Sequence, residues 1–215
     1  MRNISSTVMA LAAMVLSSMT TYLTFFDARY TLTAAVAKVS GQINRGYSSN
    51  SEGKSIDFRY WVDSTLVVSN RGTRALVISD VSAVKSNKPG SCAIDKDSKR
   101  HRVQQYIAPE YVRTQYIQPF IVEPSSVAAI PLSMGIPGLS QEIGLEEEFS
   151  LEPLHDLWCL EWKVFDPNGK MHENTMPAFL IDVAFNTPEG EDYPEGELRL
   201  DMKSGPTEIL KRGLF

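Results

Sequence analysis

The most constraining feature of this chain is a run of 23 residues, positions 4–26, that contains no charged side chain. Coiled as an α-helix at 1.5 Å per residue, such a run spans about 34 Å, enough to cross a hydrocarbon core of roughly 30 Å. Eight of its positions are Ser or Thr, whose hydroxyls can bond back to carbonyls of the preceding turn. Tyr22, Phe25 and Phe26 gather where the run ends, as aromatic rings do at a membrane–water interface. We therefore predict a single N-terminal transmembrane signal-anchor helix over residues 1–27.

Two other interpretations of this segment stay open from the residues alone. A cleaved signal peptide fits Arg2, the apolar residues 8–16 and the small Ser17 and Ser18, although apolar character resumes at residues 22–26. A buried helix of a soluble protein fits the moderate hydrophobicity that the Ser, Thr and Ala content gives the run.

The charges that flank the segment predict its orientation. Arg2 precedes it, whereas Asp27 and Arg29 follow it and nearly cancel. Positive charge favours the cytoplasmic side, which places the N-terminus inside and the rest of the chain outside. The one glycosylation sequon, at Asn3, lies on the predicted cytoplasmic side. We therefore predict a bacterial inner-membrane protein with a periplasmic domain.

Small residues follow one side of the predicted helix and make it a candidate interface with another membrane helix. Small side chains let helices approach closely in lipid. The candidate interface residues are Ser6, Ala10, Ala13, Ser17, Thr20 and Thr21.

Beyond residue 27 the sequence is typical of a mainly β domain. Apolar residues alternate over positions 30–36 and 56–62, a period that indicates half-buried strands. Turn residues at 70–74, 123–126 and 166–169 each separate two β-rich segments, and each predicts a hairpin. Composition and turn pattern resemble immunoglobulin-like ectodomains, which implies an antiparallel β-sandwich. We assign this domain to residues 28–187.

Four shorter segments are predicted to lie outside the strands. Residues 40–55 are rich in Gly, Ser and Asn and predict a loop. Residues 141–149 and 153–157 are each expected to form a short helical turn. Residues 188–215 begin with an acidic, Gly- and Pro-containing stretch and are predicted to be a linker and C-terminal tail, in which residues 197–202 are expected to form an edge strand.

The charge balance argues against nucleic acid as a partner. Residues 27–215 carry 20 basic and 26 acidic side chains, a net charge of −6 (20 minus 26). Nucleic-acid binding requires clustered Lys and Arg. The longest basic cluster, residues 99–102, is short and is interpreted as a solvated turn.

Cys92 and Cys159 are the only cysteines. Outside the cytoplasm an even pair favours a disulfide, which would tie the loop around Cys92 to the strand that contains Cys159. Two unpaired buried thiols are the alternative. A redox-active pair is disfavoured because the Cys-x-x-Cys spacing that depresses a thiol pKa does not occur.

Few residues suggest a binding surface, and no motif suggests catalysis. Tyr106, Tyr111 and Tyr116 lie in a polar stretch, where aromatic rings fit a recognition surface or a long hairpin. His155 and Cys159 have a spacing that can chelate zinc, but they lack a second pair of ligands. No nucleophile elbow, phosphate loop or zinc-protease motif occurs in the sequence, so we predict no cofactor, no metal and no enzymatic activity.

Together these features predict a membrane-anchored accessory protein that presents a β-sandwich outside the cytoplasm, as a subunit or partner of a larger membrane complex. The alternative is a binding module for a glycan or peptide that uses the loop tyrosines. A hydrolase or thiol-redox enzyme is the third possibility.

Overall fold

The computed structural model describes residues 9, 12–21, 30–106, 114–191, 193–203 and 207–212. Within these residues the chain is mainly β, and every strand pairing is antiparallel. The strands are β1 (Tyr30–Asn50), β2 (Gly53–Asn70), β3 (Leu76–Lys85), β4 (Arg100–Arg102), β5 (Gln104–Tyr106), β6 (Thr114–Tyr116), β7 (Phe120–Val122), β8 (Ser126–Ile143), β9 (Leu154–Phe165), β10 (Met171–Asn186), β11 (Glu195–Met202) and β12 (Thr207–Arg212).

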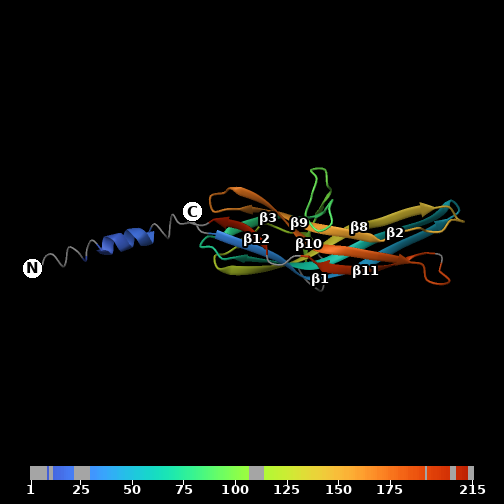
Figure 1. The fold of residues 1–215 in the computed structure, drawn as a ribbon, viewed down its shortest axis with the longest axis horizontal. Helices are drawn as coiled ribbons and strands as arrows, with labels where there is room; N and C mark the ends of the chain where they lie inside the picture. Colours follow the sequence, from blue (N-terminus) through green and yellow to red (C-terminus); the bar gives the residue numbers. More distant parts are fainter. Residues whose placement is uncertain are drawn as a thin grey trace, which may run out of the picture.

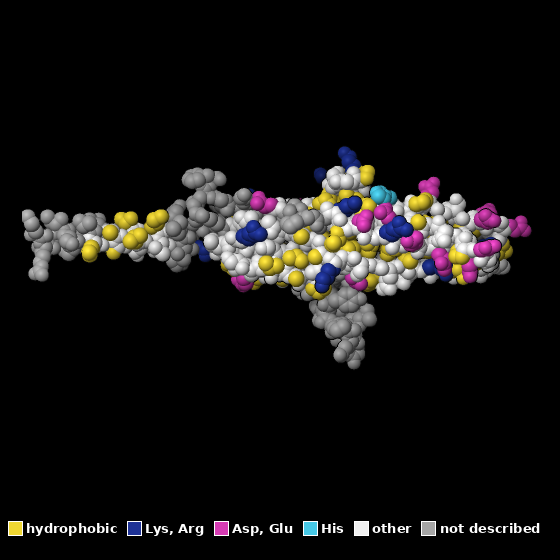
Figure 2. All heavy atoms as spheres, turned by 60° about the horizontal axis from the view of Figure 1, so that its bottom comes forward, with side chains coloured by type: hydrophobic (Ala, Val, Ile, Leu, Met, Phe, Trp, Pro, Cys, Tyr) yellow, Lys and Arg dark blue, Asp and Glu magenta, His cyan; other side chains and the backbone are white. Residues whose placement is uncertain are grey.

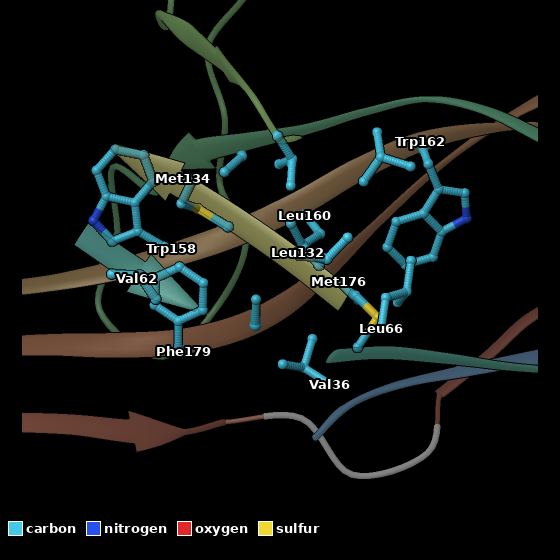
Figure 3. Close-up of a cluster of buried hydrophobic side chains, with 14 of the residues drawn as sticks. Val36, Val62, Leu66, Leu132, Met134, Trp158, Leu160, Trp162, Met176 and Phe179 are labelled. Carbon is cyan, nitrogen blue, oxygen red and sulfur yellow. The ribbon is translucent and has the colours of Figure 1, made fainter. Parts of the chain in front are cut away.

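The strands form two sheets that pack face to face (Figure 1). Sheet A has the order β12-β1-β2-β8-β5-β6, and sheet B has the order β11-β10-β9-β3-β4, with β7 also pairing with β3. The alternation predicted for residues 56–62 is confirmed, because Ile56, Phe58, Tyr60 and Val62 are all buried between the sheets. Residues of β9 meet them from sheet B, where Trp158 and Trp162 flank Leu160 from opposite sides (Figure 3).

The sandwich is elongated and has two distinct ends (Figure 1). At 3.3 Å per residue, the 18 residues of β2 span about 60 Å. The start of β1 and the end of β12 lie side by side at one end, where Tyr30 pairs with Arg212; we call this the near end. The opposite end, which we call the far end, holds the turns at residues 51–52, 144–153 and 187–194.

Buried polar groups close the near end. The Tyr30 hydroxyl donates to Oδ2 of Asp166 (3.2 Å), and the amides of Asn168 and Lys170 donate to its Oδ1 (2.9 and 3.0 Å). Nε2 of His172 lies 3.4 Å from Oδ2. Burial alone would raise the pKa of Asp166, but these hydrogen bonds outweigh it and hold the pKa below its ordinary value. The β9–β10 turn therefore fixes the start of β1.

Asn70 provides the second polar contact point at this end and is fully buried. Its Nδ2 donates to the carbonyls of Arg74 (2.7 Å) and Val122 (3.0 Å), and its Oδ1 accepts from the Gly72 amide (2.9 Å). This one side chain thus joins the end of β2, the β2–β3 connection and β7.

At two of the three turns, the prediction of a hairpin is wrong. Strands do flank residues 70–74 and 123–126, but in each case the chain crosses from one sheet to the other. The third prediction is confirmed, since β9 and β10 pair directly across the turn at residues 166–170, with Phe165 opposite Met171. Local turn chemistry specifies a reversal, whereas the partner sheet is chosen by packing.

Several predicted loops and helical turns are strands. β1 continues to Asn50 and β2 begins at Gly53, so the loop predicted over residues 40–55 is reduced to a tight turn. Residues 141–143 belong to β8, and residues 154–157 belong to β9. β11 and β12 extend the sheets beyond the segment 28–187 predicted for the domain. Long ladders between neighbouring strands override the weak β propensity of these polar segments.

The described part of the predicted anchor is helical over residues 12–21. Thr20 and Thr21 donate through Oγ1 to the carbonyls of Leu16 (2.7 Å) and Ser17 (2.8 Å), the back-bonding expected for hydroxyls in such a helix. Among the described residues, no helix has both the length and the apolar character needed to span a bilayer. Met9 is also helical, and the remaining residues of the segment 4–26 lie outside the described part of the structure.

Candidate functional site: a cavity between the sheets

The candidate site is a cavity of about 340 Å³ that opens between the two sheets. Sheet A contributes β2 and β8, and sheet B contributes β3, β4 and β9, together with the loop that joins β3 to β4. The lining residues are Tyr60, Lys85, Asn87, Ser98, Lys99, His101, Ile136, Pro137, Gly138, Leu139, Leu154, Asp156 and Trp158. A volume near the lower end of the usual range of about 300–1,000 Å³ suits a small molecule.

Tyr60 forms the wall on the sheet A side. The alternation of β2 turns its side chain inward, and only 1% of the residue is exposed. Its hydroxyl donates to no acceptor within the described residues, and the Leu139 backbone amide interacts with its oxygen. Burial raises the pKa of Tyr60 to about 12, although the nearby Leu139 amide partly opposes the shift. The hydroxyl therefore keeps its proton at neutral pH and is a donor in need of an acceptor.

Trp158 forms the facing wall on β9. It is 4% exposed, and its indole Nε1–H also lacks a hydrogen-bond partner within the described residues. Figure 3 shows the indole nitrogen on the side of the ring that faces away from Leu132 and Leu160. The ring of His101 packs edge-on against the indole, with the ring centroids 5.3 Å apart. The cavity thus brings together two buried donors from different sheets.

A bulge in β8 shapes the apolar side of the cavity. Between Asp57 and Arg59 of β2 the register shifts, and β8 accommodates one additional residue around Pro137 and Gly138. A Cβ on Gly138 would lie 2.4 Å from the Phe58 carbonyl oxygen and 2.8 Å from the Tyr60 ring. Only glycine fits there, because any side chain would push β8 away from Tyr60.

The β3–β4 loop, residues 86–99, forms the rim and is held at three places. Ser86 Oγ donates to the Ser91 carbonyl (2.6 Å) and accepts from the Ala93 amide (3.1 Å). Cys92 is disulfide-bonded to Cys159, the neighbour of Trp158, with the Cα atoms 6.0 Å apart. At its C-terminal side the loop enters β4, where Arg100 contacts both carboxylate oxygens of Glu161 (2.7 and 3.5 Å).

The rim and the strand ends beside it are the basic part of an acidic chain. Residues 85–102 contain six Lys or Arg and two Asp, a net charge of +4 (six minus two), of which the loop 86–99 itself carries +1 (three minus two), whereas the whole chain carries −5. Lys85 pairs with Asp156 at 2.7 Å, and Lys99 is exposed beside them. Burial and the charge of Lys99 lower the pKa of His101 below its ordinary value, so its ring is neutral at pH 7.

The loop projects from the side of the sandwich (green in Figure 1). In contrast, Asp and Glu side chains gather at the far end (Figure 2), where the exposed acids of residues 142–152 and 189–197 lie. The electrostatic field therefore favours an anion at the cavity mouth over one at the far end.

The predicted site residues fall in several places. Cys92 and Cys159 are joined, so Cys159 is not available as a metal ligand. Ala13, Ser17, Thr20 and Thr21 are exposed on the helix, while Ser6 and Ala10 lie outside the described residues.

The tyrosine surface stays a prediction. Tyr106 and Tyr116 lie on the paired strands β5 and β6, opposite Thr114 and Gln104, but their side chains lie outside the described part of the structure. Tyr111 lies outside the described residues altogether. Neither Tyr106 nor Tyr116 is among the residues that line the cavity.

Sequence reasoning missed the cavity, although parts of it carried a signal. Residues 99–102 are predicted to form a solvated turn, but His101 of that cluster packs on Trp158. The Pro137-Gly138 pair inside a strand was the available clue, because these residues in a strand interior mark bulges and close approaches.

Comparison with known proteins gives no relative for this chain: no family model, no curated protein and no solved structure matches it.

Proposed function

We propose that this chain is a membrane-anchored extracytoplasmic binding protein whose sandwich takes a small ligand into the cavity between its sheets. The observation that carries the proposal is the cavity itself, which has a volume of about 340 Å³ and is lined by residues of both sheets, with Tyr60 and Trp158 in its walls. A concave site with apolar and aromatic walls and a few polar groups is the usual form of a small-molecule site.

Two features support the anchored, extracytoplasmic part of the proposal. Met14, Val15 and Leu16 on the described helix are 72%, 62% and 65% exposed, an apolar surface that favours a lipid or protein environment. The Cys92–Cys159 disulfide fits an oxidising compartment such as the periplasm. In this arrangement the near end faces the membrane.

The strand order supports an immunoglobulin-like fold. Taken in their order across each sheet, β1, β2, β8 and β5 correspond to strands A, B, E and D of such a domain, and β3, β9 and β10 to strands C, F and G. The disulfide differs, because Cys159 on the F-like strand is bonded to the loop after the C-like strand instead of to the B-like strand. This change leaves the B-like strand free to place Tyr60 at the cavity.

Ligand binding can be tested with the full chain in detergent micelles, labelled with 5-fluorotryptophan. The protein has three tryptophans: Trp158 in the cavity, Trp162 in the core beyond Leu160, and Trp61 against Gly135 on the other face of β2. In a ¹⁹F NMR screen of small polar compounds, we expect ligands that shift the Trp158 resonance saturably and leave those of Trp61 and Trp162 in place.

Single Trp→Phe variants assign the three resonances. Trp162 is the comparison residue, because its Nε1 is also buried and has no hydrogen-bond partner among the described residues, but it lines a different cavity, of about 360 Å³, beside Glu161 and Lys163. Compounds that shift Trp162 or Trp61 as strongly as Trp158, or a library in which no compound shifts Trp158, would argue against a binding cavity.

Membrane orientation needs its own measurement. A Ser51→Cys variant places a thiol in the β1–β2 turn at the far end, while the native cysteines stay bonded. We expect a membrane-impermeant maleimide to label it in spheroplasts with intact inner membranes. Labelling only after the inner membrane is permeabilised would place the domain in the cytoplasm.

A second candidate function, an accessory subunit, is favoured by the far end. Tyr47, which is 38% exposed, packs against Tyr193 (ring centroids 4.8 Å apart) and Phe149 (6.4 Å). Arg45 lies over the Tyr193 ring at 4.3 Å. Aromatic residues among exposed acids suit a protein partner with a basic surface.

Site-specific crosslinking separates this role from ligand binding. A photo-crosslinking residue at Ser51, at the far end, is expected to give one discrete adduct in native membranes, and the same residue at Asn168, at the near end, is expected to give none. Equal adducts from both positions, or none from Ser51, would remove the support for a far-end partner.

A further inference from the structure

We propose that β1 at the far end takes up an extended basic segment of a partner protein, which adds to sheet A as a further strand. The inference rests on the accessory-subunit function and adds how the partner docks and what charge it carries. Strand addition of this kind draws its affinity from main-chain hydrogen bonds and its specificity from every second side chain.

Residues 40–50 of β1 form an edge of sheet A, which we call the open edge. β12 pairs with β1 only over residues 30–34, and no described strand pairs with that side of residues 40–50. All residues of this segment except Ile43 are exposed. The backbone groups on this side are therefore accessible to an added strand.

The alternation of the β1–β2 ladder shows which backbone groups face the open edge. The Thr31 carbonyl accepts from the Arg71 amide (2.8 Å), so the odd residues at the start of β1 face β2. The bulge between Ala37 and Ser40 shifts the register by one residue, and beyond it the even residues face β2. The residues whose amides and carbonyls point to the open edge are therefore Gly41, Ile43, Arg45, Tyr47 and Ser49.

Other strands with unpaired sides carry features that discourage strand pairing, and the open edge lacks them. β4 and β6 have three residues each, and β12 has six. β8 contains Pro137 beside its bulge, and β11 has a charged residue at every second position from Glu195 to Asp201. Short length, proline, bulges and charge are the means by which proteins prevent unwanted pairing at an edge. Residues 40–50 contain no proline and a single charged side chain, Arg45.

The open edge is held in its extended form by contacts with β11. A Cβ on Gly41 would lie 2.6 Å from Cδ1 of Leu200, so the glycine lets β11 pack closely on the inner side of β1. Arg45 donates through Nη1 to the Pro194 carbonyl (3.3 Å). An edge that is already extended loses little conformational entropy when a strand binds to it.

Acidic side chains beside the open edge determine the charge of the partner. Residues 187–201 contain six Asp or Glu and one Arg, a net charge of −5 (one minus six). Arg45 shows how a basic side chain meets this segment, because its Nη1 lies 3.5 Å from Oε1 of Glu195. A second copy of the chain would bring two acidic segments together, whereas a strand with Lys or Arg at alternate positions complements them. The charges therefore favour a basic segment of a different protein.

Amide hydrogen exchange measured by NMR on the full chain in a non-ionic detergent tests the docking mode. The probe is a capped nine-residue peptide in which Thr and Lys alternate. At saturation we expect the amides of Gly41 and Ile43 to exchange at least tenfold more slowly, because they then donate to the peptide. Those of Gln42 and Asn44, which already face β2, should not change.

Matched peptides separate strand pairing from attraction between charges. N-methylation of alternate amides removes the donors along one side of an extended peptide and leaves its charge unchanged. Of the two alternately methylated forms, we expect one to bind like the parent peptide and the other to bind at least tenfold more weakly. A peptide in which Thr and Glu alternate should give no protection. Equal binding by both methylated forms would overturn the inference, because charge alone would then drive binding.

Two variants tie the affinity to the acids beside the open edge. Glu195→Gln is expected to weaken binding of the Thr–Lys peptide about two- to fivefold. Glu146→Gln, at an exposed position in the turn 144–153, is the matched control and is expected to leave it unchanged. Equal effects of the two variants would contradict docking beside β11.

The outcomes separate strand addition from the accessory-subunit function. Protection of Gly41 and Ile43 without peptide, rising with protein concentration, would make the occupant a second copy and overturn the inference. If no peptide protects them while the crosslinker at Ser51 gives its adduct in native membranes, strand addition is overturned and a far-end partner stands. If the crosslinker at Ser51 also gives no adduct, the accessory-subunit function itself fails.

Discussion

The near end and the cavity both bury polar groups, and they treat them in opposite ways. At the near end, Asp166 receives three hydrogen bonds from the described residues and contacts His172, and Asn70 makes three. In the cavity walls, the side chains of Tyr60 and Trp158 are equally buried and donate to no acceptor within the described part of the chain. The degree of burial is similar, since Asn70, Asp166, Tyr60 and Trp158 are 0%, 7%, 1% and 4% exposed.

The difference separates a structural role from a binding role. A satisfied buried network stabilises one arrangement of the chain, and losing one member leaves the others unpaired. An unsatisfied donor stabilises nothing until a ligand reaches it. Substitutions at the near end should therefore cost stability, and those in the cavity should cost affinity.

The largest effect is expected from the crosslink that holds the cavity rim. The Cys92–Cys159 bond closes a loop with a sequence separation of 67. Replacing both cysteines with serine should lower the free energy of unfolding by about 4 kcal/mol in the chain-entropy model, measured by urea denaturation. A reductant should have no further effect on the double variant. An unchanged denaturation midpoint would show that the loop is held by its other contacts alone.

At the near end, Asn70→Ala should cost about 3 kcal/mol, because it leaves two carbonyls and one amide without their partner. Asn44→Ala, at an exposed position on β1, is the matched control and should change stability by less than about 0.5 kcal/mol. Similar losses of stability in both variants would mean that the buried hydrogen bonds of Asn70 contribute no more to stability than an exposed side chain does.

The carboxylate of Asp166 should make the near end sensitive to acid. Its pKa is depressed in the folded state, so its stabilisation is present above the unfolded pKa near 3.8 and is lost as pH falls through the folded value. At pH 7, Asp166→Asn should cost about 1–2 kcal/mol, and the difference from wild type should shrink below pH 4. A difference independent of pH would contradict this assignment.

The smallest effect, and the sharpest contrast, comes from two tyrosines. Tyr30→Phe removes a hydroxyl that donates to Asp166 and should cost about 1 kcal/mol, whereas Tyr60→Phe removes one that donates to no described acceptor and should change stability by less than about 0.5 kcal/mol. Thermal unfolding of both variants in the same buffer checks the pair. Equal losses would show that Tyr60 is engaged within the protein.

Strand positions were largely predictable, because a strand that buries every second side chain shows alternating apolar residues in its local sequence. Residues 30–36 and 56–62 alternate as predicted, and Gly169 occupies the positive-φ position expected of it in the β9–β10 turn. The prediction of a loop was wrong for residues 40–50, because a polar strand at the end of a long hairpin gains its stability from the hydrogen-bond ladder with β2.

The cavity was beyond sequence reasoning, since its parts are distant in the chain. Tyr60, Lys99 and Trp158 belong to a strand of sheet A, a loop and a strand of sheet B. The sequence of a turn such as residues 70–74 carries the same signal whether the two flanking strands pair with each other or join different sheets. The unpaired state of the two donors is likewise a property of packing, which no local pattern contains.

By itself, then, the sequence determined the apolar N-terminal segment, the strand faces, the turns and the basic stretch around residue 100. These follow from side-chain periodicity and local backbone preference, which act over a few residues. Only the tertiary structure decided which sheet each strand joins, and so that Tyr60 and Trp158 face one cavity beneath Lys99. Strand pairing and sheet packing join residues far apart in the chain, and the candidate site arises at that level.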